Sequence, residues 1–232
     1  MVTNTRTRDS RGPGVLLFAV AVTLALYVVP YGYYLAYPLV LLSTYAHEMG
    51  HGITALFVGG EFDAFVMSLD GSGVAYLRIP DRRFSSAATA AGGLVGPAVL
   101  AGVFFRLARH PKTAHVGLLG FGVATLVAFV VIARSLFSWV FVGGLGVACV
   151  YLGMKSSARV AQGVLAFMAV QLSLSVFSRS DYLFTQTAGE APSDVAQMAS
   201  ALFLPYWFWG IVCAVTSVLV LTFGLKAFLR SP

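Results

Sequence analysis

Two histidines and a glutamate lie within five consecutive residues, as His47, Glu48 and His51. On an α-helix, residues four apart share a face, so both imidazoles can reach one metal ion. Zinc is the ion typical of this His-Glu-x-x-His spacing, and it acidifies a water molecule that it binds. Glu48 is placed to take the proton of that water and to pass it to a leaving group. The motif therefore predicts a Zn²⁺ site with His47 and His51 as ligands and Glu48 as the general base.

The helix that carries this motif is expected to lie in a membrane. The chain is 58% hydrophobic and only 10% charged, with a mean hydropathy of +0.84, which is typical of integral membrane proteins. Between Tyr33 and Val58, Glu48 is the only charged residue, and about 20 apolar residues are enough to cross a bilayer. Ionisable side chains in such a segment are costly unless they are paired or bind a metal, so the cluster indicates a functional site.

The remaining composition excludes other classes of partner. The net charge of +6 comes from basic residues scattered at the ends of apolar runs, which favours anchoring at a lipid bilayer and predicts no nucleic-acid partner. The two cysteines, Cys149 and Cys213, lie within apolar runs and are expected to be small buried side chains without a disulfide.

The pattern of apolar runs predicts an all-α polytopic membrane protein with about seven transmembrane helices. A polar tail covers residues 1–14, and residues 15–232 form a single membrane-embedded domain. The first run is similar to a secretory signal, but no small-x-small cleavage site follows it, so it is expected to be retained. The predicted spans are residues 15–29, 33–58, 87–107, 116–133, 136–152, 160–177 and 206–229.

Two shorter elements are predicted between the spans. Apolar residues alternate on either side of Asp70-Gly71, which predicts a short β-hairpin over about residues 61–83, directly after the metal-binding helix. Residues 193–204 carry apolar side chains at helical spacing, which predicts an amphipathic helix capped by Ser193.

The sequence from the motif to the third apolar run resembles the site-2 protease family of intramembrane zinc metalloproteases. The resemblance is carried by HEMGHG in a membrane helix, the following Gly59-Gly60, the hairpin, and the glycine-rich stretch that ends at Pro97. It is closest to the short bacterial branch that has neither a PDZ nor a CBS domain, and it covers a minority of the chain. It implies a multi-pass protein of the bacterial cell membrane that hydrolyses peptide bonds in or near transmembrane segments of membrane-protein substrates.

The resemblance also implies a third zinc ligand, an aspartate on a later span, and here the sequence departs from the family pattern. Leu69-Asp70-Gly71 copies the family string, but it lies in the predicted hairpin, where Asp-Gly is favoured as a turn. His110 and His115 flank the loop after the third span, which is expected on the opposite face of the membrane from the end of the second span.

Asp181 is the predicted third ligand. It follows the sixth span, which runs parallel to the second, so the C-terminal ends of both spans are expected on one side of the membrane. Pairing with Arg179, or capping of a helix, is the alternative for this side chain. Asp194 competes for the position, but its place after the cap Ser193 explains it as a first-turn acid, and Asp63 is a weaker competitor.

Two features bear on how a substrate is held. Gly92-Gly93-Leu94-Val95-Gly96-Pro97 contains Gly-x-x-x-Gly, which favours close helix packing. The family often continues Gly-Pro with an asparagine that contacts substrate, whereas Ala98-Val99-Leu100 follows here, so no substrate-binding residue is assigned. The hairpin could pair with an extended substrate by strand addition, or it could be a polar plug at the membrane surface.

We therefore interpret the chain as an intramembrane zinc endopeptidase. A membrane zinc hydrolase of a non-protein substrate is the alternative within enzymes, because the same metal and base suit any acyl transfer. A non-catalytic membrane scaffold with a structural metal site is the alternative outside them. An open coordination position would favour catalysis, and a fourth protein ligand would favour structure. The sequence indicates no oligomeric state.

Overall fold

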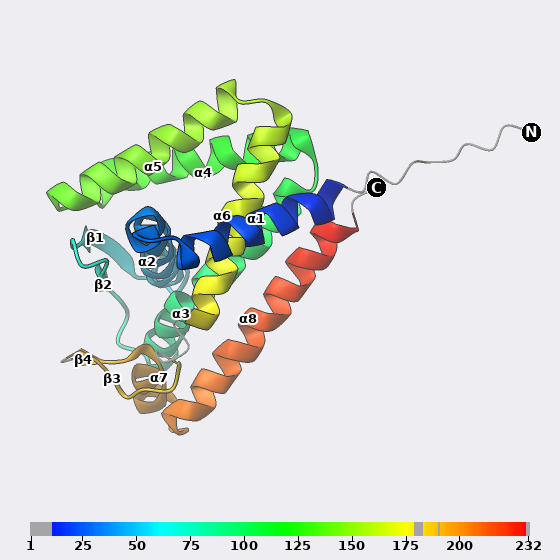
Figure 1. The fold of residues 1–232 in the computed structure, drawn as a ribbon. Helices are drawn as coiled ribbons and strands as arrows, with labels where there is room; N and C mark the ends of the chain where they lie inside the picture. Colours follow the sequence, from blue (N-terminus) through cyan, green and yellow to red (C-terminus); the bar gives the residue numbers. More distant parts are fainter. Residues whose placement is uncertain (1–10, 179–182, 190, 231–232) are drawn as a thin grey trace, which may run out of the picture.

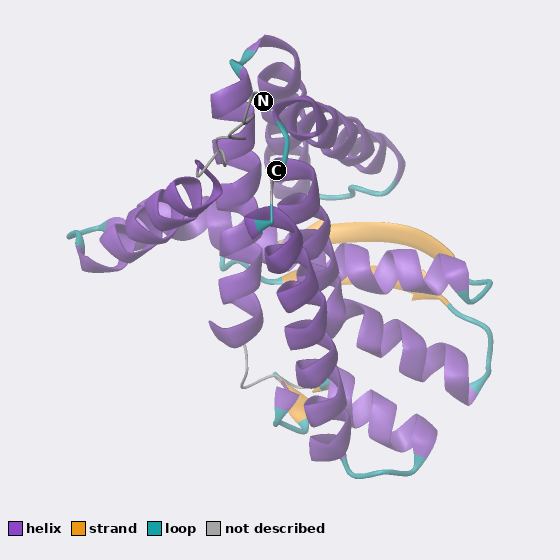
Figure 2. Ribbon diagram, turned by 90° about the vertical axis from the view of Figure 1, so that its right-hand side faces the viewer, coloured by secondary structure: helices purple, strands orange, loops and turns teal. Residues whose placement is uncertain are grey.

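The structure is a computed structural model that describes residues 11–178, 183–189 and 191–230. Within these ranges the protein is a bundle of long helices with two small hairpins at one side (Figures 1 and 2). The elements in chain order are α1 (Arg11–Val28), α2 (Gly32–Phe57), β1 (Glu61–Met67), β2 (Gly73–Arg78), α3 (Arg83–Ala108), α4 (Pro111–Val131), α5 (Leu136–Lys155), α6 (Ala158–Ser178), β3 (Thr187–Ala188), β4 (Ala191–Pro192), α7 (Asp194–Leu202) and α8 (Tyr206–Leu229).

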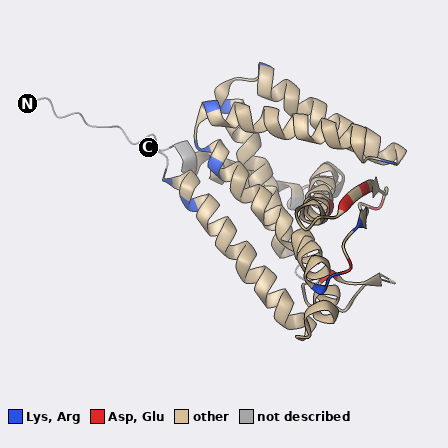
Figure 3. Ribbon diagram, turned by 180° about the vertical axis from the view of Figure 1, so that it is seen from behind, with Lys and Arg blue, Asp and Glu red and all other residues tan. Residues whose placement is uncertain are grey.

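The protein is a polytopic, mostly helical membrane protein, as the sequence predicts. A helix lies at each of the seven predicted spans, and in the described part of the chain five of them, α3, α4, α5, α6 and α8, are long and apolar enough to cross a bilayer. The apolar part of α1 is shorter than the length needed to cross a bilayer. α2 is long enough to cross, but the charged and polar side chains of its motif and its hydroxyl side chains lower its mean hydropathy. Charged residues lie at helix ends and on the hairpin, and the middles of the long helices carry very few (Figure 3).

α3 is the central helix of the bundle and packs against α2, α6, α7 and α8. Its approach to α2 is close because both helices present glycines at the contact. A Cβ built on Gly50 would collide with the carbonyl of Gly92, and one built on Gly96 would lie 3.0 Å from the Cα of Gly50. The Gly-x-x-x-Gly pattern therefore has the packing role that the sequence predicts. This contact fixes the motif helix against the middle of the molecule.

The hairpin β1–β2 is present where the sequence predicts it, with Phe65 opposite Ala75 and Met67 opposite Gly73. Its loop is longer than the two-residue Asp-Gly turn that was expected. The amide of Gly71 donates to the carbonyl of Ser68, and Gly71 has φ 86°, so a tight turn is followed by a glycine in the left-handed region. A three-residue loop of this kind also requires a glycine at the left-handed position, which explains why glycine follows Asp70 here.

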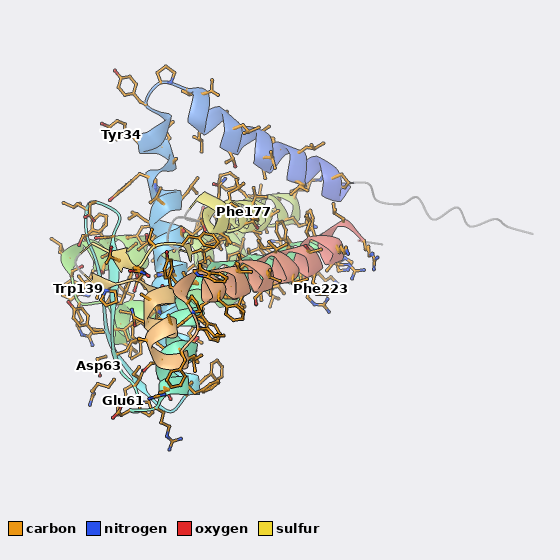
Figure 4. All side chains as sticks on the ribbon, turned by 90° about the horizontal axis from the view of Figure 1, so that it is seen from below. Tyr34, Glu61, Asp63, Trp139, Phe177 and Phe223 are labelled. Carbon is orange, nitrogen blue, oxygen red and sulfur yellow. The ribbon has the colours of Figure 1, made fainter. Side chains whose placement is uncertain are left out.

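The two long edges of this hairpin differ. The outer edge of β1 is occupied by the connection between α4 and α5, because the amide of Phe65 donates to the carbonyl of Ile132 and the amide of Arg134 donates to Phe65. The edge of β2 faces α2 instead. At the far end of the hairpin, Glu61 and Asp63 project from β1 (Figure 4), and Arg78 of β2 forms ion pairs with both.

Candidate metal centre

Three side chains that could bind a metal ion converge from α2 and α7. His47 Nε2 lies 3.2 Å from His51 Nε2, and Asp194 places Oδ2 3.3 Å from His47 Nε2 and Oδ1 3.5 Å from His51 Nε2. All three side chains are half-buried, and in the described part of the chain they form the one cluster of three or more such ligands. The two histidines lie together as the motif predicts.

The spacing of these atoms fits a tetrahedral ion. With ligand distances of about 2.0–2.1 Å and tetrahedral angles, two ligand atoms are about 3.3–3.4 Å apart. The three observed separations, from 3.2 to 3.5 Å, bracket that value. Two imidazoles and one carboxylate also match the donor set of catalytic zinc sites, which keep the fourth position for water or substrate. The residues present can therefore hold a tetrahedral metal ion.

α3 orients the second histidine of the motif. His51 Nδ1 lies 2.8 Å from the carbonyl oxygen of Thr89, so the ring donates its Nδ1–H there and presents Nε2 to the metal position. Gly93, one turn further along α3, lies against the same ring, and a Cβ at this position would collide with the imidazole. A carbonyl and a glycine of α3 thus fix the tautomer and the position of His51.

Asp194 is the first residue of α7, and the local structure around it is the one that the sequence predicts. The hydroxyl of Ser193 accepts a hydrogen bond from the amide of Ala196, at 3.2 Å, and so caps the helix. Burial disfavours the charged form of Asp194, but hydrogen bonds with His47 and His51 outweigh it and hold the pKa of this carboxyl well below its usual range. Asp194 is therefore both a first-turn acid and a partner of the histidines.

Glu48 lies beside this cluster and is held by the hairpin. Its Oε2 accepts a hydrogen bond of 2.8 Å from the backbone amide of Ala75 on β2. Gly73 allows this approach, because a Cβ there would lie 3.0 Å from the Cγ of Glu48 and 2.7 Å from Thr44. Thr44 in turn donates to the carbonyl of Gly71. The hairpin is thereby attached to the same face of α2 that carries the motif.

A cavity of about 830 Å³ opens over the cluster. Its wall contains His47, Glu48, His51 and Asp194, together with the edge of β2, the start of α3 and the segment around β3 and β4. The segments that follow α2 and α6 thus lie round one space, as the argument from parallel spans predicts. Within the described residues no fourth Cys, His, Asp or Glu joins the cluster. The metal position can therefore be reached from this cavity.

The other candidates from the sequence are placed as follows. Asp181, the predicted third ligand, lies outside the described residues. Asp70 accepts hydrogen bonds from the amide and hydroxyl of Ser72, which lower its pKa and hold it in the hairpin turn. Asp63 pairs with Arg78, which lowers the pKa of its carboxyl. His110 immediately precedes α4 and makes no side-chain capping bond, and His115 contacts carbonyl oxygens of Pro111 and Ser156, away from the cluster.

Three further groups that position the site were not assigned from the sequence. These are the carbonyl of Thr89, the glycine at position 93 and the amide of Ala75. Two of them are backbone groups, and residue types do not predict the position of a backbone group. Gly93 lies inside the glycine-rich stretch, which is the one sequence feature that could have indicated its role.

In a comparison with protein families, residues 17–224 match the model described as Peptidase M50B-like. Comparison with curated proteins and with solved structures gives no match. The matched range covers most of the chain and contains the motif helix, the hairpin and Asp194. The chain therefore belongs to the Peptidase M50B-like family of membrane metallopeptidases, which is the site-2 protease family that the motif resembles.

Proposed function

We propose that this protein is an intramembrane zinc endopeptidase that cleaves peptide bonds in or near the transmembrane segments of other membrane proteins. The observation that carries the proposal is the triangle of His47, His51 and Asp194 beside Glu48, in a cavity bordered by membrane-spanning helices. Family membership supports the metallopeptidase class. The bacterial cell membrane is the location that goes with the short branch of the family.

In this proposal His47, His51 and Asp194 hold the ion, and Asp194 takes the place of Asp181, the ligand predicted from the sequence. Bound zinc would acidify a water molecule and polarise the scissile carbonyl. Glu48 would accept the proton of that water at its carboxylate and pass it to the leaving amine. The amide of Ala75 keeps this carboxylate at the edge of the cavity while the proton moves.

The edge of β2 that borders the metal cavity favours a peptide over other acyl substrates. The amide of Ala75 points away from β1 and towards Glu48, so this edge runs along the metal cavity. An extended substrate segment could pair with it by strand addition, which would place a peptide bond beside the base. A lipid or a small amide has no backbone to use such an edge. A purely structural metal site would have no use for the buried carboxylate of Glu48 beside an accessible metal position.

The proposal is tested with the Glu48→Gln variant of the full-length protein, purified in detergent. Both imidazoles and Asp194 remain, so the variant should bind zinc with the wild-type stoichiometry. The amide cannot accept the proton, so cleavage of single-span membrane-protein substrates should fall by about 10²–10⁴-fold. Metal content is measured by elemental analysis and cleavage by mass spectrometry of the products. A variant that cleaves at the wild-type rate would remove Glu48 as the base and the protease proposal with it.

A further inference from the structure

A second, smaller cavity lies behind the first histidine of the motif. It has a volume of about 50 Å³ and is lined by residues of α2, α3, α6 and α8, together with Leu183. Among the residues that the structure describes, His47 alone lines both this cavity and the large metal cavity. Its imidazole therefore lies between a small space within the bundle and the space in which we propose that zinc and substrate bind.

The two histidines of the motif differ in how their second nitrogen is satisfied. His51 donates Nδ1–H to the carbonyl of Thr89. For Nδ1 of His47 the described residues offer no hydrogen-bond partner. A histidine that binds a metal through Nε2 almost always donates its other N–H to a carboxylate, a carbonyl or a water molecule, because this bond sets the tautomer and the orientation of the ring. His47 needs such a partner from the side of the small cavity.

Two buried serines supply polar groups to that cavity. Ser43 of α2 is 4% exposed and Ser217 of α8 is 1% exposed, and both line it. Hydroxyls in the middle of a helix usually bond to a carbonyl of the preceding turn, as Ser173 and Thr216 do here at 2.7 Å. Within the described part of the chain, neither Ser43 nor Ser217 makes a hydrogen bond of this kind or of any other. Their hydroxyls are therefore available to the cavity.

The size of the cavity matches water. A water molecule occupies about 30 Å³ in the liquid, and a buried one needs two to four polar partners. The ring of His47 and the hydroxyls of Ser43 and Ser217 provide three such partners around 50 Å³. Ser175 lines the same cavity, but its hydroxyl already donates to the carbonyl of Leu172.

We propose that a water molecule bound in this cavity accepts the Nδ1–H of His47 and donates to Ser43 and Ser217, so that His47 presents Nε2 to the metal. Ser43 and Ser217 are then positioning residues of the metal site, acting through water, and Ser217 brings α8 into a site otherwise built from α2, α3 and α7. The inference rests on the proposed metal site for its consequence, whereas the hydrogen bonds themselves exist in the metal-free protein.

The test compares the Ser43→Ala/Ser217→Ala double variant with Thr216→Ala and Ser173→Ala, whose hydroxyls bond to their own helices. Ser217→Val is a second variant, in which the added methyl groups fill the cavity. Zinc affinity is measured by competition with a chelator, and the absorption spectrum of the cobalt-substituted protein reports ligand geometry. The double variant and Ser217→Val should bind zinc about 10–100-fold more weakly, with an altered cobalt spectrum. Both controls should match wild type, and thermal unfolding identifies any variant that is merely misfolded.

A metal-free measurement separates this inference from the proposed function. In protein labelled with ¹⁵N-histidine, His47 should carry its proton on Nδ1 in the wild type and should become a mixture of tautomers in the double variant. This measurement tests the inference whether or not the protein binds zinc. A wild-type protein that binds no zinc would contradict the proposed function alone. Unchanged zinc affinity and an unchanged tautomer in the double variant would overturn the inference. So would a protein group bonded directly to His47 Nδ1 in a high-resolution structure.

Discussion

Asp194 Oδ2 lies 3.3 Å from His47 Nε2, although one residue opens α7 and the other lies in the second half of α2. The contact exists because α3 packs against both helices and so brings the start of α7 over the motif. The position of the proposed third ligand is therefore set by the packing of a nine-residue helix on the central helix of the bundle.

This contact predicts that Asp194→Ala removes a metal ligand. Two imidazoles alone leave the ion short of ligands, so zinc affinity should fall by at least about 100-fold, more than the loss of an outer-shell partner. Asp181→Ala, the variant that the sequence favoured as disruptive, should bind zinc within about 3-fold of wild type. Chelator competition on both purified variants gives the two affinities. The opposite ranking would return the third-ligand position to Asp181.

The sequence could predict the neighbourhood of this ligand but not its identity. The pattern Ser193-Asp194 indicated a capped helix with a first-turn acid, and that interpretation is correct. It did not exclude a second role, because the outward-facing carboxylate at the start of a helix is free to bind whatever tertiary packing places opposite it. The segment after α6 lies beside the motif of α2, as predicted, and the parallel course of the two spans stays a prediction. The packing of α7 on α3 decides which acidic residue of that segment reaches the histidines. No local sequence pattern predicts this packing.

Gly93 gives a second prediction, because its lack of a side chain makes room for the imidazole of His51. In Gly93→Ala the new Cβ must push the ring or separate α2 from α3, so zinc affinity and activity should both fall by about 10–100-fold. Gly144→Ala on α5 is the matched control, since a Cβ there meets nothing within 4 Å. A helix-interior alanine should stabilise that control slightly. If Gly93→Ala bound zinc as tightly as the control, the ring would not depend on this glycine.

The glycine-rich stretch contains glycines with different roles that a sequence pattern does not distinguish. Spacing identified Gly92 and Gly96 as a packing pair, and both lie at the contact with α2. The neighbouring glycine at 93 faces the metal site, and nothing in its spacing distinguishes it from the other two. The amide of Ala75 has even less signal, because any residue other than proline provides the same donor.

The arrangement of the segments after α2 and α6 around one cavity gives a topological prediction. Single cysteines at Glu61 and Thr185, in a chain whose Cys149 and Cys213 are replaced by alanine, should react with an impermeant thiol reagent from the same side of the membrane. A cysteine at Lys112, at the start of α4, should react from the other side, because α3 crosses between them. Labelling of intact vesicles measures all three. Opposite labelling of Glu61→Cys and Thr185→Cys would exclude the parallel course of α2 and α6.

The final prediction concerns the bond between Ala75 and Glu48. Ala75→Pro removes the amide that holds Glu48 Oε2 at 2.8 Å, and proline is tolerated on an edge strand where the N–H does not belong to the ladder. A hydrogen bond to a charged group contributes about 1.5–3 kcal/mol, so kcat should fall by about 10–100-fold while zinc affinity stays at the wild-type value.

Leu77→Pro is the matched variant for this prediction. Backbone amides of a strand alternate in direction, so the amide of Leu77 faces the same outer edge as that of Ala75 but lies two residues away from the bond to Glu48. If an extended substrate pairs with β2, Leu77→Pro should raise KM and leave kcat close to wild type. Steady-state kinetics on one membrane-protein substrate separate the two effects. Equal losses of kcat in both variants would mean that proline disrupts the hairpin as a whole, and a wild-type kcat in Ala75→Pro would show that Glu48 works without this amide.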